Sequence, residues 1–311
     1  MSNKEINREV KIKLYEKAKE IMSGFLEKES NLTSLRQNNW VFITKGQRKN
    51  YMVKFVPEPE GARLRVEVGI ARMLKEKTDI PIPEVLQFGS WEEYLYLFRE
   101  VIEGETIIET VKRRDDTEAL FYQAGEALAK LHLIGFQEKG ILNQNMEVES
   151  ASIFNREEFM GFVEKLQKYE VLCERDIEVL SNINIAAYFP SGNNVLCHGD
   201  YSLNNLIAKE NTLAGIIDFE WAMAAPPMDD IASFDVFMEL EGMKEKIEAY
   251  YKGYQSIQKI EKLYFENINF YKLYRLATMV SYQIAAKDEQ FDENRLELMK
   301  KMLKERIRML T

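Results

Sequence analysis

The sequence of 311 residues has only two cysteines, two histidines and no long apolar run. Cys173 and Cys197 fit neither a metal-binding spacing nor a disulfide framework, so a reducing, cytoplasmic setting is expected. With His132 and His198 as the only histidines, a zinc enzyme is not expected. No stretch approaches the roughly 20 apolar residues that cross a bilayer, and the N-terminus lacks the apolar segment of a secretory signal.

Excess positive charge is also missing, because the formal net charge is −9. That balance argues against general affinity for nucleic acid or for an anionic membrane, so neither is expected as a partner. It permits a cationic small substrate without requiring one. The chain has no internal repeat, low-complexity tract or long linker, and its length allows two lobes. The oligomeric state stays open.

The stretch from Val195 to Trp221 combines a hairpin pattern with polar residues at one end. Two apolar runs, 206–208 and 213–217, flank turn residues, which predicts two antiparallel strands. In such a pair the residue that opens the first strand lies beside the one that closes the second, so Asn205 and Asp218 should converge. An amide oxygen and a carboxylate together suit Mg²⁺. Asp200, just before them, could accept a proton from an attacking hydroxyl.

The first third of the chain predicts a helix over 8–28, strands over 32–35, 40–44 and 51–56, and a helix over 62–77. Lys54 alternates with Val53 and Phe55 and therefore projects from the opposite strand face. Glu67 lies beside the apolar stripe of the second helix, where a carboxylate needs a partner. We expect Lys54 and Glu67 to form an ion pair, the alternative being that both face solvent.

A proline-rich stretch at 80–83 ends the helix over 62–77. Strands are expected over 85–88 and 94–98, followed by a connector over 99–104. We place the boundary between a strand-rich N-terminal lobe, 1–102, and a mostly helical C-terminal lobe, 103–311, within that connector. Apart from the hairpin, the second lobe predicts helices almost throughout: 117–135, two within 155–188, 228–240, 243–254, 260–286 and 290–310.

Taken together, these residues resemble the aminoglycoside phosphotransferase and choline kinase-like family, which shares its architecture with protein kinases. H-x-D-x4-N followed by I-D-F is the pattern of the catalytic loop and metal strand of kinase-like phosphotransferases. The matching positions are Lys54, Glu67, 80–86, 97–104, 128–132, 198–200, Asn205, 217–220 and 227–232. The resemblance implies an α+β, bilobal, protein-kinase-like fold: a small N-terminal antiparallel-sheet lobe and a larger, mostly helical C-terminal lobe, with the nucleotide between them.

The resemblance also implies a role for each matching residue. Asp200 would be the catalytic base, Asn205 and Asp218 the Mg²⁺ ligands, and Lys54 the cation for the α- and β-phosphates of ATP or GTP, positioned by Glu67. The remaining roles fall to the backbone of Glu100 and Ile102 at the purine edge, to His198 as a brace of the catalytic loop, and to His132 as a core residue.

Several positions depart from protein kinases and favour a small-molecule kinase. Ser202 stands where protein kinases carry a lysine, the metal strand ends Asp218-Phe219-Glu220, and no Ala-Pro-Glu segment follows. The loop expected to cover the phosphates, 33–39, contains no glycine, so Ser34 and Asn38 would supply its hydrogen bonds.

The acceptor is the open part of the interpretation. Asp229, Asp230, Asp235 and Glu239, with Glu241, could recognise an amino sugar, or could be a helix N-terminus and a solvated face. Tyr271, Tyr274 and Tyr282 could line a site for choline, although aromatic stripes are more often core. We expect an aminoglycoside-like antibiotic as acceptor and a link to antibiotic resistance. The alternatives are an amino-alcohol kinase of the choline or ethanolamine type, and a non-catalytic kinase-fold binding protein.

Overall fold

The structure, a computed structural model, describes residues 3–25, 31–36, 40–45, 49–150, 153–190, 192–286 and 292–310. Residues 46–48, which join two of the expected strands, and residues 37–39, the end of the loop expected to cover the phosphates, lie outside the described residues. Within the described part of the chain, no helix is long and apolar enough to span a membrane.

Contacts within the chain form two compact units. Unit 1 comprises Met1–Thr110, Asn143–Glu147 and Asn205–Trp221, and unit 2 comprises Val111–Leu142, Val148–Asn204 and Ala222–Thr311. The predicted hairpin therefore groups with the N-terminal segment by its contacts, while the boundary expected after Ile102 stays a prediction.

Unit 1 contains an antiparallel sheet in the order β1-β2-β3-β5-β4. Its strands are β1 (Asn31–Arg36), β2 (Trp40–Lys45), β3 (Asn50–Pro57), β4 (Val85–Trp91) and β5 (Tyr94–Val101). All five contain the strands that the alternating pattern predicts. Lys54 of β3 lies opposite Leu97 of β5, and Met52 lies opposite Arg99. Residues that face each other across a ladder, and residues two positions apart on one strand, share a face. Lys54 and Arg99 therefore project from the same side.

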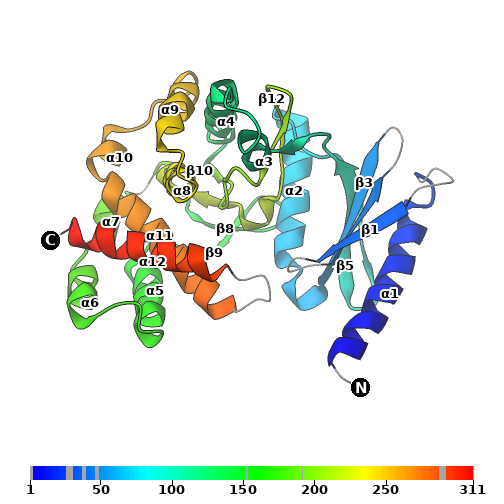
Figure 1. Ribbon diagram of the computed structural model, residues 1–311, viewed down its shortest axis with the longest axis horizontal. Coiled ribbons are helices and arrows are strands. Elements are labelled where there is room, and N and C mark those ends of the chain that lie inside the picture. Colours follow the sequence, from blue (N-terminus) through cyan, green and yellow to red (C-terminus); the bar gives the residue numbers. More distant parts are fainter. Residues whose placement is uncertain are drawn as a thin grey trace. The chain divides into compact units, whose positions relative to one another are not determined.

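A helix covers each face of this sheet. α1 (Asn3–Met22) packs Leu14, Ala18 and Met22 against one face, around Phe42 and Phe55. α2 (Ala62–Lys77) covers the other face with Leu64 and Val68, and its bounds agree with the predicted 62–77. The blue α1 and the cyan α2 are labelled in Figure 1. Apolar side chains fill both faces of the sheet. Lys54 and Arg99, on the face that α2 covers, are therefore exceptions.

A second, smaller sheet of unit 1 confirms the predicted hairpin. Its order is β12-β11-β6, formed by β6 (Glu105–Thr106), β11 (Leu206–Lys209) and β12 (Thr212–Ile216). The Ile217 N–H donates to the Asn205 carbonyl at 3.0 Å, which closes the hairpin at its open end. Three short helices follow strands in the chain: η1 (Glu58–Glu60) directly follows β3, α3 (Ile107–Val111) directly follows β6, and η2 (Phe219–Trp221) comes shortly after β12.

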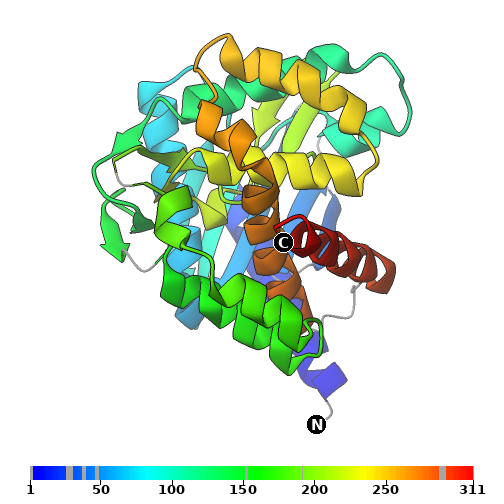
Figure 2. The same cartoon turned by 90° about the vertical axis from the view of Figure 1, so that its left-hand side faces the viewer.

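Unit 2 is mainly helical, as predicted. Its helices are α4 (Glu118–Leu131), α5 (Arg156–Lys168), α6 (Glu174–Ser181), α7 (Ile185–Tyr188), α8 (Met228–Leu240), η3 (Lys244–Lys246), α9 (Ile247–Gln255), α10 (Lys262–Glu266), α11 (Ile268–Ala286) and α12 (Glu293–Arg308). α4 and α9 lie side by side in Figures 1 and 2, where they are green and yellow. The contact is close because glycines line it: a Cβ on Gly125 would lie 2.0 Å from the Tyr250 carbonyl oxygen.

Unit 2 also contains a five-stranded antiparallel sheet in the order β7-β10-β13-β8-β9, which the sequence analysis missed. Its strands are β7 (Gly135–Phe136), β8 (Gly140–Leu142), β9 (Val148–Ser150), β10 (Asn194–Cys197) and β13 (Met223–Ala225). Such short strands are too brief to show an alternating pattern, so the prediction of helices almost throughout this lobe did not include them.

Candidate active site

Lys54 lies at the centre of a cluster of three carboxylates in unit 1. Its Nζ is 3.2 Å from Glu67 Oε2, 3.4 Å from Asp218 Oδ1 and 2.7 Å from Glu220 Oε2. Lys54 is 7% exposed and Glu67 5% exposed, so their interaction is shielded from water. The predicted Lys54–Glu67 ion pair is confirmed. Glu220 is a partner that the sequence analysis did not predict, although it belongs to the stretch that carries the resemblance.

Local structure explains how Glu220 reaches Lys54. The hairpin ends at Ile216, and η2 turns the chain immediately afterwards, so that Glu220 lies on the same side as Asp218. Beside it, the Arg63 guanidinium of α2 lies 3.0 Å from the centre of the Trp221 ring. This cation–π contact joins η2 to the helix that carries Glu67. The three carboxylates therefore come from α2 and from the segment after β12.

The cluster has more negative than positive charge, because three carboxylates surround one ammonium group. Ligand atoms of Glu67, Asp218 and Glu220 all lie within 4.8 Å of one another. Burial acts to lower the pKa of Lys54, but the three carboxylates outweigh it and raise that pKa above its ordinary value. Burial also raises the pKa of Glu67, and the charges of Asp218 and Glu220 add to the rise. An oxygen-only donor set with surplus negative charge fits a hard divalent cation such as Mg²⁺.

Asp218 and Asn205 lie at the open end of the hairpin, as predicted. Leu206 pairs with Ile216, and the next hydrogen bond joins Asn205 to Ile217, directly before Asp218. Asp218 has a φ of 68°, a left-handed conformation that costs energy for residues other than glycine and occurs at functional sites. Its side chain is 40% exposed, unlike that of Lys54, so its carboxylate can reach a ligand.

Asp200 lies in unit 2, in a loop that is anchored through its backbone. Asp230 accepts hydrogen bonds from the His198 N–H at 2.6 Å and from the Gly199 N–H at 2.9 Å. The Asp200 N–H in turn donates to His198 Nδ1 at 3.3 Å, which fits the predicted bracing role of His198. Gly199 has a φ of 79°, which glycine adopts without strain. The peptides before Asp200 are therefore held in place.

Two further residues extend this anchoring. His132 Nε2 lies 3.3 Å from Asp230 Oδ2, and its Nδ1 lies 2.8 Å from the Tyr254 hydroxyl oxygen. His132 is buried, as expected of a core histidine. Burial acts to raise the pKa of Asp230, but its bonds to His132 and to the loop backbone outweigh burial and lower that pKa.

Arg275 of α11 holds the loop from another side and was also missed. One of its terminal nitrogens donates to the Gly199 carbonyl and to Ser233 Oγ, both at 3.1 Å. The other lies 3.4 Å from Asp229 Oδ2. Burial raises the pKa of Asp229 to about 6, against the opposing effect of Arg275. No local pattern indicates this bond, because Arg275 lies far from Gly199 in the sequence.

The acids expected to recognise the acceptor are engaged within unit 2. Asp229 and Asp230 hold the Asp200 loop, as described above. Asp235 Oδ2 accepts from the Tyr264 hydroxyl at 2.7 Å and lies 3.3 Å from Lys272 Nζ. Glu239 pairs with Lys272 at 2.9 Å and with Arg306 at 2.5 Å. The alternative of a solvated face is wrong for these four acids, and their contact with an acceptor stays a prediction.

The three tyrosines that could line a choline site differ in their exposure to solvent. Tyr271 and Tyr274 are buried, and their hydroxyls donate to the Tyr188 carbonyl at 2.8 Å and to Glu158 at 2.6 Å. These two residues are therefore core, as the more common interpretation of an aromatic stripe expects. Tyr282 alone is exposed, at 47%.

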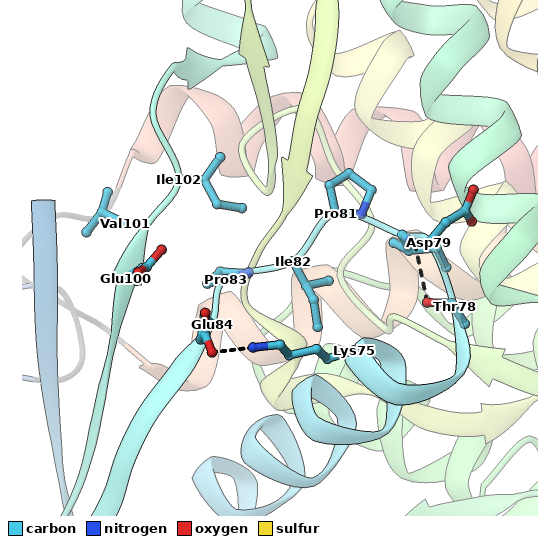
Figure 3. Close-up of a pocket in the computed structure, with 11 residues that line it drawn as sticks. Lys75, Thr78, Asp79, Pro81, Ile82, Pro83, Glu84, Glu100, Val101 and Ile102 are labelled. Carbon is cyan, nitrogen blue, oxygen red and sulfur yellow. Dashed lines mark hydrogen bonds and ion pairs between the residues drawn. The ribbon is translucent and has the colours of Figure 1, made fainter. Parts of the chain in front are cut away.

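The segment expected at the purine edge borders a cavity of about 330 Å³ in unit 1. Figure 3 shows Glu100, Val101 and Ile102 on one side of this cavity and the loop from Thr78 to Glu84 on the other. The Glu100 N–H donates to the Glu84 carbonyl at 3.0 Å, which fixes the start of the segment. Ser34 lies in β1 opposite Phe42, and its contact with phosphate stays a prediction.

The profile of the phosphotransferase enzyme family matches residues 31–260. No curated protein sequence matches.

Solved structures resemble the fold over nearly the whole chain. The GDP complex of a mutant aminoglycoside 2′-phosphotransferase-IIIa has a TM-score of 0.70 at 16% identity, covering 96% of this chain and 99% of that one. A thermostable mutant of aminoglycoside phosphotransferase APH(4)-Ia with AMP-PNP and hygromycin B has 0.69 at 15%, covering 93% and 97%. A protein provisionally named fructosamine-3-kinase, from Haemophilus somnus 129PT, has 0.63 at 16%, covering 89% and 90%. The chain therefore belongs to the phosphotransferase enzyme family and has its protein-kinase-like fold.

Proposed function

We propose that the protein is a Mg²⁺-dependent kinase that transfers the γ-phosphate of ATP or GTP to a hydroxyl group of a small cationic acceptor. The observation that carries this proposal is the buried Lys54 among Glu67, Asp218 and Glu220. Such a cluster places one ammonium group and three carboxylates close together, a concentration of ionisable groups that is typical of functional sites. A phosphate would bind the ammonium group, and a metal ion would bind the carboxylates. Membership of a phosphotransferase family supports the same chemistry.

Each unit-1 residue would then have a separate task. Lys54 would bind the α- and β-phosphates, and Glu67 would hold its ammonium group in place. Asn205 and Asp218 would hold Mg²⁺, which when bound neutralises charge on the phosphate oxygens. Backbone groups of Glu100 and Ile102 would bind the purine edge, and Ser34 would donate to a phosphate oxygen.

Asp200 would act on the acceptor. Its carboxylate would accept a hydrogen bond from the acceptor hydroxyl, orient that oxygen towards the γ-phosphorus and take the proton as the oxygen–phosphorus bond forms. The hydrogen bonds from His198 and Gly199 to Asp230, together with the Arg275 bond to the Gly199 carbonyl, would keep Asp200 in one position. Such positioning is a main source of rate enhancement in phosphoryl transfer.

We propose an aminoglycoside-like antibiotic as the acceptor. The net charge of −9 favours a cationic molecule, and solved structures of similar fold include aminoglycoside phosphotransferases. An amino alcohol such as choline or ethanolamine is the second candidate. One observation favours it: Glu220, which contacts Lys54, belongs to the stretch Ile217–Ala222 that resembles choline and ethanolamine kinases.

A coupled nucleotide assay with an acceptor panel tests this proposal. Kanamycin-type sugars, choline and ethanolamine are compared, each with MgATP and with MgGTP. Turnover with one class, lost in Asp200→Asn and retained in the exposed Asp116→Asn, supports the proposal and identifies the acceptor. Expression of an antibiotic kinase in a susceptible bacterium should also raise the inhibitory concentration of its substrate. Nucleotide binding without turnover on any acceptor would instead support a non-catalytic binding protein.

A further inference from the structure

Arg99 is a buried cation on the sheet face that carries Lys54. It lies opposite Met52 in the β3–β5 ladder, one pair along from Lys54 and Leu97. Only 9% of Arg99 is exposed. Arginine is seldom buried to this extent unless its charge and its N–H groups have partners. The sequence analysis gave Arg99 no role beyond its place in the connector.

The hydrogen bonds of Arg99 are incomplete within unit 1. One terminal nitrogen donates to the Glu100 carbonyl at 3.3 Å, and Nε has no hydrogen-bond partner. Among the described residues, no carboxylate lies within salt-bridge distance of its guanidinium. Burial lowers the pKa of Arg99, and the charges of Glu67 and Asp218 oppose that shift. A guanidinium group has five N–H donors, so a ligand acceptor could complete this set.

The position of Arg99 on the sheet lies between the proposed phosphate site and the proposed purine site. Lys54 and Met52 are two residues apart on β3, which corresponds to about 7 Å along the strand. A nucleotide with its phosphates at Lys54 and its base at Glu100 therefore passes the end of the sheet face where Arg99 lies. The Glu100 carbonyl, which would accept a hydrogen bond from the base, already accepts one from Arg99.

The two purines differ at this point in a way that a guanidinium group distinguishes. At C6, adenine presents an amino donor, whereas guanine presents a carbonyl acceptor next to the N7 acceptor. An adenine amino group would face the donors of Arg99 and compete with them for the Glu100 carbonyl. Guanine O6 would instead accept from the guanidinium group. Paired contacts of arginine with guanine O6 and N7 are the commonest specific contact to that base.

We propose that Arg99 reads the C6 group of the purine and that the protein prefers GTP to ATP as its phosphate donor. This inference rests on the proposed function, because that function places the purine at Glu100. A good arginine–guanine pair discriminates between bases by roughly 5- to 150-fold in affinity. GDP should therefore bind the wild type at least about 5-fold more tightly than ADP.

Titration calorimetry with GDP, ADP and inosine diphosphate, each with Mg²⁺, tests the inference on the wild-type protein. Inosine diphosphate carries the C6 carbonyl group without the 2-amino group of guanine, so it should bind like GDP. Arg99→Met should bring the GDP to ADP affinity ratio close to one, and Arg99→Lys should give an intermediate ratio. Arg65→Met, a half-exposed arginine on α2, should leave the ratio unchanged.

The outcomes separate this inference from the proposed function. Equal binding of GDP and ADP, or tighter binding of ADP, would overturn the role of Arg99 and leave the kinase proposal intact. Tight GDP binding with weak inosine diphosphate binding would also overturn it, because recognition would then lie at the 2-amino group. If neither nucleotide binds, the proposed function itself fails. Should Arg99→Met not fold, the three wild-type affinities still decide the matter.

Discussion

Lys54 lies closer to Glu220 than to Glu67: its Nζ is 2.7 Å from Glu220 and 3.2 Å from Glu67. Glu67 is deeply buried, while the side chain of Glu220 is 22% exposed. Glu67 is therefore the partner of Lys54 that is shielded from water, whereas Glu220 is open to it; under the proposed function, Glu220 would give way to a phosphate. The surplus negative charge of the cluster also means that a cation should stabilise it.

The first prediction concerns that cation. Mg²⁺ without nucleotide should raise the melting temperature, because an ion that binds only the folded state stabilises it by mass action. The shift should shrink in Asp218→Asn and in Glu220→Gln, which remove donor charge. Differential scanning fluorimetry at constant ionic strength measures this shift, with Glu248→Gln, a change at an exposed residue of α9, as the control. An equal shift in all four proteins would rule out a metal site at this cluster.

The second prediction concerns Lys54 itself. Lys54→Met should lower kcat by about 100- to 1000-fold, the usual effect of removing one group that stabilises transition-state charge. Lys209→Met, an exposed strand lysine paired with Glu103, should have little effect. Steady-state kinetics with the acceptor found in the panel provides the measurement. Circular dichroism should accompany it, because Lys54→Met also leaves Glu67 buried without its partner. Nearly normal kcat in folded Lys54→Met would contradict the assigned role.

The third prediction is a pH dependence of stability caused by Asp229. Its pKa in the folded protein is about 6, above the ordinary value of 3.8, so the folded state binds a proton more tightly than the unfolded state. This contribution to stability is complete below the ordinary pKa and is lost as the pH rises through about 6. Between pH 5 and pH 7 the wild type should lose about 1.4 kcal/mol relative to Asp229→Asn.

Urea unfolding of both proteins at pH 5 and pH 7 tests that difference. Because Asn resembles the protonated, uncharged carboxyl group, the stability of Asp229→Asn relative to the wild type should rise by about 1.4 kcal/mol from pH 5 to pH 7. A stability difference between the two proteins that is the same at both pH values, or that shifts in favour of the wild type, would show that the pKa of Asp229 is not raised.

The fourth prediction concerns the contact of α4 with α9. A Cβ on Gly125 would lie 2.0 Å from the Tyr250 carbonyl oxygen, and one on Gly253 would lie 1.8 Å from the Tyr122 carbonyl oxygen. Either alanine should separate the helices and destabilise the protein by about 1–3 kcal/mol. Gly161→Ala, in α5 with nothing within 4 Å of its Cβ, should stabilise it by about 0.5–1 kcal/mol. Urea denaturation measures the free energy of unfolding of the three variants. Equal changes in all three would show that α4 and α9 do not approach this closely.

The sequence predicted the fold and the site best where a regular apolar pattern also fixed the position of a charged or polar residue. The apolar stripe of α2 gave its bounds, and a carboxylate beside that stripe indicated the pair with Lys54. The alternating runs on either side of a turn predicted β11 and β12. Asn205 and Asp218 followed from the geometry of any antiparallel hairpin.

Other features depend on contacts that no local pattern shows. Asp235 and Glu239 look like surface acids in the sequence, and their burial depends on Lys272, 33 residues after Glu239. Arg99 comes directly after the apolar run of β5, where a charged residue suggests the exposed end of a strand, yet it shares its face with Leu97 and α2 covers that face of the sheet. Only the tertiary packing distinguishes a buried charge from a solvated one.

The hydroxyl of Tyr254 ends a chain of bonds that begins at the Asp200 loop and passes through Asp230 and His132. Tyr254 follows Gly253 in α9, so the backbone contact that fixes the separation of α4 and α9 also fixes the position of this hydroxyl. A random-mutagenesis selection for activity should therefore recover α9 as a sensitive region, although none of its residues needs to touch nucleotide or acceptor. Engineering that trims or grafts α9 would change the position of the Asp200 loop without altering a single residue within it.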